Sequence, residues 1–408
     1  MRFPDDVPTL ADGDVTLRAH RIEDAEAAVE QCIDPTSIRW TTVPLNYTVD
    51  HARAFLTETM PKGWESGSEF GFAIETTHPN GERRFSGTAS LRDEGDRRAE
   101  IAFGAHPAIR GRGVMTSAVT LLLDWGFKSR DLETVSWWAN RGNVGSRRVA
   151  WKTGFTFGGT IRRWLDHRGE YPDAWVASLH RDDNREPKTR WLETPVIGGE
   201  NVVLRPLRED DVPTIVGGCN DPRSRQFLPF LPDPYTTEDA LDYLVRSVEH
   251  ASLGTGVNWA MADPASGRHL GNIGLPRMGR QEAEIGYWAH PDARGRGVTS
   301  EAVRLLIRHA FIDPEDGGLG LDRVFLKAAE TNPASQHIAR VNGMTEYGRE
   351  RGSERLGDGS VVDMVLFDLL RDEWLARQRG HTVGHEGGRA AAGRDRLVGD
   401  RSGRGSDS

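Results

Sequence analysis

Two segments of this chain have nearly the same sequence: HPAIRGRGVMTSAV, which begins at His106, and HPDARGRGVTSEAV, which begins at His290. Each follows a strand-like segment, AEIAFGA in the first case and AEIGYWA in the second, and each opens a helix-like run. A glycine-rich turn between a strand and a helix N-terminus offers unpaired backbone N–H groups to an anion, and the helix dipole adds attraction. The repetition therefore predicts a phosphate-bearing ligand in each of two similar halves.

Further matches show that the repeat extends over whole domains. Cys32 matches Cys219, and Asp34-Pro35 matches Asp221-Pro222, at nearly constant spacing. A chain of 408 residues is expected to form two or three domains. We expect a first domain over 1–185, a charged linker over 186–198 and a second domain over 199–378. The last segment, 379–408, has no apolar periodicity and is expected to be a disordered tail.

Composition and charge exclude several classes of protein. A net charge of −9 argues against a broad nucleic-acid surface. The N-terminal MRFPDDVPTL lacks a secretory signal pattern, and no apolar run reaches the roughly 18 residues of a membrane span. The 2 cysteines occupy equivalent positions in the two halves, which argues against a disulfide. We therefore expect a cytoplasmic monomer or homodimer with no nucleic-acid, membrane or metal partner.

The same order of elements runs through each half. A short strand and a helix precede three strands and the glycine turn; a helix, a strand, another helix and a final strand pair follow. The helix after the turn has one apolar face, formed in the second half by Ala302, Leu305, Leu306 and His309. This mixture of strands and helices predicts an α/β or α+β fold.

The order strand, R-G-x-G turn, helix, strand, N-x-x-S, helix and G-F resembles the GNAT N-acetyltransferase superfamily, and this chain contains it twice. It is most similar to the RimJ/RimL branch, which acetylates protein α-amino groups. The resemblance covers roughly residues 12–180 and 199–370. It implies two tandem GNAT-like domains, each a mixed, mostly antiparallel sheet flanked by helices.

In that family the glycine turn cradles the pyrophosphate of an acyl-CoA, so the resemblance implies acetyl-CoA as the acyl donor. A turn of this type fits, because glycines let the backbone approach a diphosphate and arginines add positive charge. Met115 and Thr299 depart from the pattern, since the family has a small residue there. A plain helix-entry turn is the alternative; a nucleotide P-loop fits less well, because no G-K-[ST] follows. The implied cofactor-binding residues are Phe103, Ala105, Arg110, Gly111, Arg112, Gly113, Val114, Met115 and Asn143 in the first half, and Tyr287, Ala289, Arg294, Gly295, Arg296, Gly297, Val298, Thr299 and Asn332 in the second.

Glu100 and Glu284 are the candidate general bases. A protonated amine must lose a proton before it attacks a thioester, and a nearby carboxylate can accept that proton directly or through water. The resemblance places a glutamate with this role in the strand before the glycine turn, where both halves have one. A solvent-facing strand glutamate is the alternative interpretation of both residues.

Ser146 and Ser335 are the candidate proton donors to the leaving thiolate. By the resemblance, each serine lies near the thioester sulfur, and the asparagine of its N-x-x-S motif binds the cofactor arm. Asn and Ser at a helix start are also good N-caps, and that simpler interpretation explains the spacing by itself. No tyrosine lies on this helix in either half, so the superfamily's usual tyrosine acid is not visible.

Other residues of chemical interest have simpler explanations. His106 and His290 each precede a proline before the turn, which favours a local structural role. Trp137 and Trp138 are adjacent on a predicted strand, so one of them should be core while the other could line an acceptor site.

The sequence thus predicts an N-acetyltransferase that moves an acetyl group from acetyl-CoA to a primary amine by direct attack in a ternary complex. The acceptor could be a protein N-terminus, an aminoglycoside, a polyamine or a small metabolite. Two alternatives remain: one catalytic half joined to a structural half, or a non-catalytic acyl-CoA-binding or sensing protein.

Overall fold

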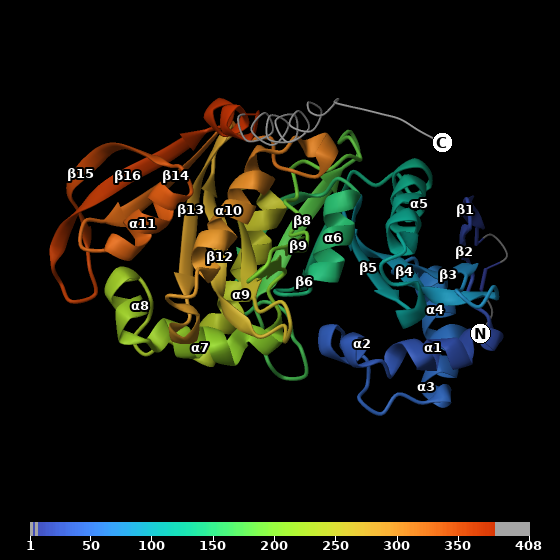
Figure 1. Ribbon diagram of the computed structural model, residues 1–408. Coiled ribbons are helices and arrows are strands. Elements are labelled where there is room, and N and C mark those ends of the chain that lie inside the picture. The colour runs from blue at the N-terminus through green and yellow to red at the C-terminus, as the bar shows by residue number, and fades with distance from the viewer. Residues whose placement is uncertain (1–2, 5–6, 380–408) are drawn as a thin grey trace, which may run out of the picture. The chain divides into compact units, whose positions relative to one another are not determined.

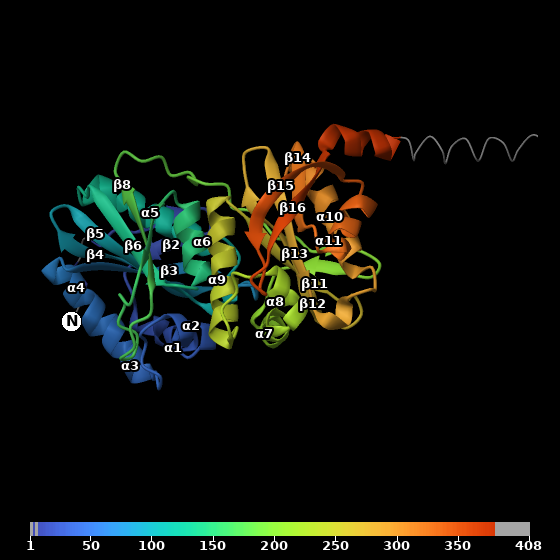
Figure 2. The ribbon, with the colours of Figure 1, turned by 90° about the vertical axis from the view of Figure 1, so that its left-hand side faces the viewer.

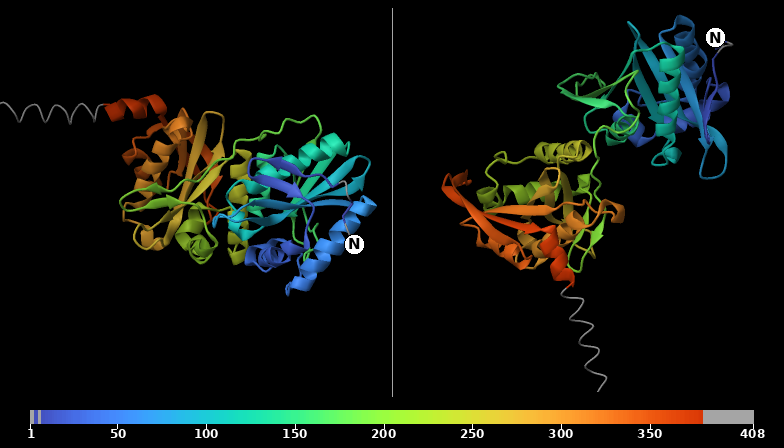
Figure 3. Two further views of the ribbon diagram at one scale, coloured as in Figure 1. Left: turned by 90° about the vertical axis from the view of Figure 1, so that its right-hand side faces the viewer. Right: turned by 90° about the horizontal axis from the view of Figure 1, so that it is seen from above.

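The computed structural model describes residues 3–4 and 7–379 (Figure 1). These residues fall into two compact units, one that ends at Arg190 and one that begins at Trp191. A helical stretch over 371–379 follows the last strand (Figure 3). Arg379, the first residue of the tail predicted over 379–408, belongs to this helical stretch, and the remainder, 380–408, lies outside the described residues.

The first unit is built on an eight-stranded sheet in the order β1-β2-β3-β4-β5-β6-β8-β7. Neighbouring strands are antiparallel except β5 and β6, which are parallel. The strands are β1 (Leu10–Asp12), β2 (Val15–Arg18), β3 (Glu69–Thr77), β4 (Arg83–Gly95), β5 (Arg98–Ala105), β6 (Thr134–Asn140), β7 (Thr156–Ile161) and β8 (Ala174–His180).

Capping residues mark several helix ends in the first unit. The Asp34 side chain accepts a hydrogen bond from the N–H of Ser37, with Pro35 at the first helical position. Gly67 adopts a left-handed conformation (φ 73°) and ends the helix over Met60–Ser66. The helices are α1 (Ala25–Cys32), α2 (Pro35–Trp40), α3 (Val49–Ala54), which continues through a π turn (Phe55–Thr59) into α4 (Met60–Ser66), then α5 (Val114–Ser129) and α6 (Val144–Lys152).

The second unit repeats this plan. Its sheet has the order β15-β16-β14-β13-β12-β11-β10-β9, only β13 and β14 are parallel, and β15 forms one outer edge (Figures 1 and 2). The strands are β9 (Ile197–Gly198), β10 (Val203–Arg205), β11 (Val257–Ala262), β12 (His269–Met278), β13 (Glu282–Ala289), β14 (Arg323–Ala329), β15 (Thr345–Arg355) and β16 (Val361–Leu370). The helices are α7 (Val212–Asn220), α8 (Pro222–Phe227), α9 (Thr237–Leu253), α10 (Val298–Phe311) and α11 (Pro333–Val341).

Helices pack on both faces of each sheet. In the second unit, Tyr287 contacts the core cluster that contains the buried residues of α10, and the next residue, Trp288, contacts the cluster of α7 and α9. Successive residues of a strand point to opposite faces, so these two clusters lie on opposite faces of β13. The prediction of two mixed, mostly antiparallel sheets flanked by helices is confirmed.

A buried ion pair fixes the first helix of each unit to its sheet. Arg205 donates to both carboxylate oxygens of Asp211 at 2.9 and 2.7 Å, and the two side chains are 8% and 3% exposed. Arg18 and Asp24 repeat this pair in the first unit. Burial works against the charge of Asp211, but hydrogen bonds from Arg205 and the backbone hold the pKa of its carboxyl below the ordinary value.

Asp211→Asn is expected to lower the free energy of unfolding by about 1–3 kcal/mol at pH 7, because the buried guanidinium loses its charged acceptor. A carboxyl whose pKa is depressed by folding stabilises the protein above its unfolded-state pKa of about 3.9 and loses this effect as pH falls through the folded value. Urea unfolding should therefore show a difference between wild type and variant that shrinks below pH 4. Asp210→Asn, at an exposed neighbour, should show no such difference. If the free energies of unfolding of wild type and Asp211→Asn differ by the same amount at pH 7 and at pH 3, the Asp211 carboxylate does not stabilise the fold as described.

Candidate active site

The two parallel strands of each unit separate partway along their length. Their pairing ends at Glu100 and Ser136 in the first unit, and at Glu284 and Phe325 in the second. Beyond this point β5 continues to Ala105 and β13 to Ala289, each paired on its other edge only. The predicted cofactor-binding residues Phe103, Ala105, Tyr287 and Ala289 lie on these one-sided stretches, whose free edges can accept an extended ligand as an added strand.

Each free edge leads into a glycine turn with an open surface. Gly111 and Gly113 have φ values of 75° and 79°, and Gly295 and Gly297 have values of 69° and 74°, which glycine adopts without strain. A Cβ atom added to any of them would meet nothing within 4 Å. No side chain caps α5 or α10, so the first N–H groups of both helices keep their capacity to bind an anion.

The first arginine of each turn is already paired with a carboxylate. Arg110 contacts Asp34 at 2.7 Å, and Arg294 contacts Asp221 at 2.5 Å. Although burial opposes ionisation, these bonds hold the pKa of both aspartates below the ordinary value. Asp34 and Asp221 are also the N-caps of α2 and α8, so the ion pair attaches the turn to the start of a short helix.

The remaining predicted turn residues divide into exposed and buried ones. Arg112 and Arg296 are exposed and donate only to backbone carbonyls, those of Thr77 at 3.1 Å and Asp292 at 3.3 Å. Met115 is 8% exposed and packs in the interior, so its side chain does not cover the glycine turn. Val114 and Val298 are buried, and Thr299 is half-buried. The anion-binding capacity of the turn thus lies in backbone N–H groups and in one exposed arginine per unit.

Both candidate bases are paired with an arginine on the neighbouring strand. Each glutamate side chain is 17% exposed. Arg92 contacts Glu100 at 3.3 Å and is also held by Glu69 at 3.2 Å. Arg277 contacts Glu284 at 3.2 Å, and its side chain is 78% exposed. Glu284 is therefore the more easily released of the two carboxylates, because its partner has a larger share of its surface in water.

The N-x-x-S motifs form the starts of α6 and α11. The side chains of Asn143 and Asn332 each accept a hydrogen bond from the N–H of the serine three residues later, at 3.2 Å in both cases. The side-chain Oδ1 atoms of both asparagines therefore act as helix N-caps, as the simpler interpretation predicts. Their predicted contact with the cofactor remains a prediction.

The two serines have different partners. Trp137 Nε1 donates to Ser146 Oγ at 3.1 Å, whereas Tyr287 Oη lies 2.9 Å from Ser335 Oγ. Burial raises the pKa of the Tyr287 phenol to about 12, although its bond to Ser335 lowers it. The helix itself carries no tyrosine; the phenol comes from β13 and reaches the helix from that strand.

The histidines before the turns form local contacts. His106 Nδ1 accepts from the N–H of Ala108 at 3.2 Å, and its Nε2 lies 3.0 Å from Glu30. His290 Nδ1 accepts from the N–H of Asp292 at 3.3 Å. Within the described residues, no cluster of His, Cys, Asp and Glu could hold a metal ion, and no helix is long and apolar enough to cross a membrane.

One family of known proteins matches both halves of this chain. The family model described as an acetyltransferase (GNAT) domain matches residues 14–156 and again residues 201–345. YdaF of Bacillus subtilis (strain 168), provisionally assigned as a ribosomal N-acetyltransferase, is 35% identical over 94 residues, covering 23% of this chain and 48% of that protein. The ribosomal-protein-serine acetyltransferase of Escherichia coli (strain K12) is 33% identical over 90 residues, covering 22% of this chain and 47% of that protein. The matched segments thus span about half the length of these two relatives.

Solved structures include similar chains. The ribosomal L7/L12 α-N-protein acetyltransferase RimL, solved in complex with coenzyme A, matches at 20% identity with a TM-score of 0.39. The match covers 44% of this chain and 99% of that one.

Proposed function

We propose that this chain, which belongs in both of its halves to the GNAT family of acetyltransferase domains, transfers an acetyl group from acetyl-CoA to a primary amine. The observation that carries this proposal is the repeated arrangement of an unpaired strand edge, an open glycine turn at one end of it and a glutamate at the other. The arrangement fits a long donor with a charged diphosphate and an extended amide-containing arm.

The donor's thioester supplies an activated acetyl group; the protein supplies position and proton transfer. The N–H groups of Gly111, Gly113 and the first turn of α5 would bind the diphosphate, as would those of Gly295, Gly297 and α10. The free edges of β5 and β13 would hold the amide arm. Bound in this way, the donor would have its reacting end near the point where the strands separate, next to Glu100 or Glu284.

The acceptor amine would lose its proton to the glutamate, directly or through water. Ser146 or Ser335 would donate a proton to the leaving sulfur. An indole N–H only donates, so Ser146, which accepts from Trp137, keeps its own hydrogen for another acceptor. Ser335 shares its hydrogen bond with a phenol, which can both accept and donate.

The structure offers no support for a covalent acyl-cysteine. Cys32 and Cys219 are buried, and burial raises the pKa of their thiols to about 11 and about 12. A thiol in this state is protonated and unreactive at neutral pH. The variant with both Cys32→Ala and Cys219→Ala should keep kcat within a few-fold of wild type. Acetyl label that remains on the denatured wild-type protein, and is lost in this variant, would show an acyl-enzyme instead.

The test of the proposed function is amine-dependent release of CoA. The full chain is mixed with acetyl-CoA and, separately, with peptides that have free α-amino groups, polyamines, aminoglycosides and small amines. Free thiol is measured alongside the mass of each amine. The names of the ribosomal-protein-acetylating relatives support peptides as the first class to test. One acetylated amine per thiol released is expected; binding of acetyl-CoA without release by any amine would favour a sensor.

A further inference from the structure

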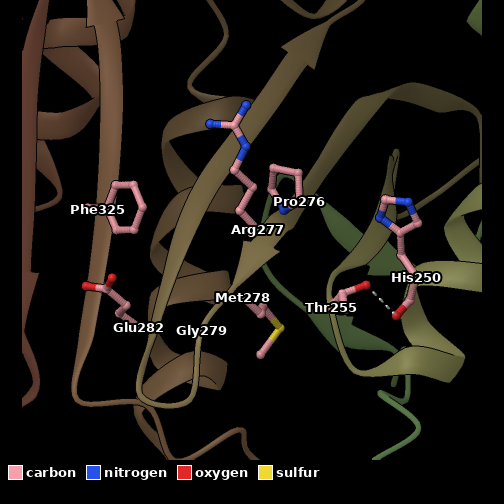
Figure 4. Close-up of a pocket in the computed structure, with 8 residues that line it drawn as sticks. All are labelled: His250, Thr255, Pro276, Arg277, Met278, Gly279, Glu282 and Phe325. Atoms are coloured by element: carbon pink, nitrogen blue, oxygen red, sulfur yellow. Dashed lines mark hydrogen bonds between the residues drawn. The ribbon is translucent and has the colours of Figure 1, made fainter.

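A cavity of about 360 Å³ opens in the second unit beside Glu284 (Figure 4). Two of its lining residues, Arg277 and Phe325, are the neighbours of Glu284 in the sheet, one on each side. In Figure 4, Phe325 and Glu282 lie on one side, His250 of α9 lies on the other, and Pro276, Arg277 and Met278 of β12 lie between them. The cavity therefore begins where the parallel strands are still paired, at the opposite end of β13 from the glycine turn.

Local sequence explains why the cavity exists here. The register of β12 against β13 shifts between Gly274 and Arg277, so Pro276 lies in an irregular segment. Gly286 leaves room for it, since a Cβ there would lie 3.2 Å from Pro276 Cγ. Gly256 follows the end of α9, and it lets the chain pass close to β12, since a Cβ there would lie 3.0 Å from the carbonyl oxygens of Leu275 and Pro276.

The corresponding part of the first unit is filled with polar groups. Glu69 follows the end of α4 as Gly256 follows α9, and it accepts from Ser90 at 2.6 Å while pairing with Arg92. Ser136 takes the place of Phe325 beside the glutamate and donates to Glu94 at 3.2 Å. The two units therefore present different surfaces to whatever approaches Glu100 and Glu284.

We infer that this cavity binds the acceptor of the second unit and that the acceptor is a primary amine carried on an apolar aryl or alkyl group. The inference rests on the proposed function. Pro276, Met278 and Phe325 supply apolar surface for the body of the molecule. Glu282 and Glu284 lie two residues apart on one face of β13, and each is paired with an arginine, Arg323 at 2.8 Å and Arg277 at 3.2 Å. The ammonium group would compete with the exposed Arg277 for Glu284, while the ring of Phe325, over which Arg323 already lies at 5.3 Å, supplies apolar surface.

The reaction that follows is balanced by groups on the two faces of β13. The amine nitrogen forms a bond to the acetyl carbon while the carbon–sulfur bond breaks. The ammonium first loses one proton to water through Glu284, and the neutral amine then attacks. The second amine proton also passes to Glu284, which releases it to water. The leaving sulfur takes the hydroxyl proton of Ser335, and Ser335 recovers a proton from water through Tyr287, with which it shares a hydrogen bond. Acceptor and donor thus approach from opposite ends of β13.

The test uses the full chain, saturating acetyl-CoA and two amines of equal charge, phenethylamine and ethanolamine. The wild type should prefer phenethylamine by at least about tenfold in kcat/KM, and calorimetry on the CoA-saturated protein should show the same preference in binding. Phe325→Ser, which installs the residue of the first unit, should remove most of this preference without changing the Kd for acetyl-CoA. The matched control in the first unit, Ser136→Ala, should leave it intact.

A wild-type preference for ethanolamine, or a Phe325→Ser variant that binds acetyl-CoA and keeps the full preference, would overturn the inference. The wild-type comparison does not depend on a variant, so a misfolded Phe325→Ser protein would not leave the inference untested. Failure of the proposed function would look different, because no amine would then cause release of CoA.

Discussion

Glu284→Gln is expected to lower kcat for an apolar amine by about 10²–10⁴-fold at pH 7, the loss typical of a missing general base. Glutamine keeps the shape of the side chain but cannot take the amine proton. The Kd for acetyl-CoA should not change, because the glycine turn and the free edge of β13 are untouched. Activity should recover as pH rises, since a larger fraction of the amine is then already neutral.

Glu100→Gln is the matched control for this substitution. Glu100 has the same exposure and the same kind of partner as Glu284, but Arg92 also binds Glu69. The control should keep the rate with the apolar amine within a few-fold of wild type. Loss of that rate in Glu100→Gln alone would place the chemistry in the first unit, and no effect from either substitution would mean that neither glutamate is the base.

The second large effect is expected at the glycine turns. Calorimetry on the wild type should give about two acetyl-CoA per chain, and Gly297→Glu should remove one of them with a loss of affinity of at least about 100-fold. A carboxylate there repels the diphosphate from the N–H groups that should bind it, and φ of 74° strains any side chain other than glycine's. Gly113→Glu should remove the other equivalent in the same way.

A substitution to asparagine separates the effect of charge on the diphosphate from the effect of backbone strain at positive φ. Asparagine tolerates a left-handed conformation better than most residues and carries no charge, so Gly297→Asn should lose much less affinity than Gly297→Glu. Gly317→Glu introduces the same charge at a φ of 83° beyond the far end of α10 from the turn, and it should leave both equivalents in place. A stoichiometry of two that persists in Gly297→Glu would show that this turn does not bind the donor.

The fold could be predicted because its signals are local and occur twice. Glycines at a strand-to-helix turn have a direct physical reason, and their repetition at matched spacing predicts two domains of one type. The structure and the family comparison confirm a tandem pair of GNAT domains. The cofactor and catalytic residues stay predictions, because their test needs a bound donor.

Contacts between distant segments could not be predicted in the same way. Asp34 and Asp221 were visible as repeated residues, but their pairing with Arg110 and Arg294 depends on how α2 and α8 pack beside the turns. Tyr287 is predicted only as a cofactor-binding residue, and its contact with Ser335 depends on how β13 packs beside α11.

The cavity beside Glu284 was also invisible in the sequence. It depends on an irregular segment of β12 and on the absence of side chains at particular glycines. A sequence pattern shows which residues of a strand alternate between the two faces of a sheet. It does not show where the pairing of two strands shifts by a residue, as it does in β12.

A crystal structure of the full chain with coenzyme A tests the central claim most directly. We expect two molecules per chain, each with its diphosphate on the N–H groups of one glycine turn, Gly111–Gly113 or Gly295–Gly297. The amide arm of each molecule should lie along the free edge of β5 or β13, with its sulfur near the last paired residues, Glu100 or Glu284. Coenzyme A bound away from both turns, or both turns empty at saturating ligand, would contradict this claim.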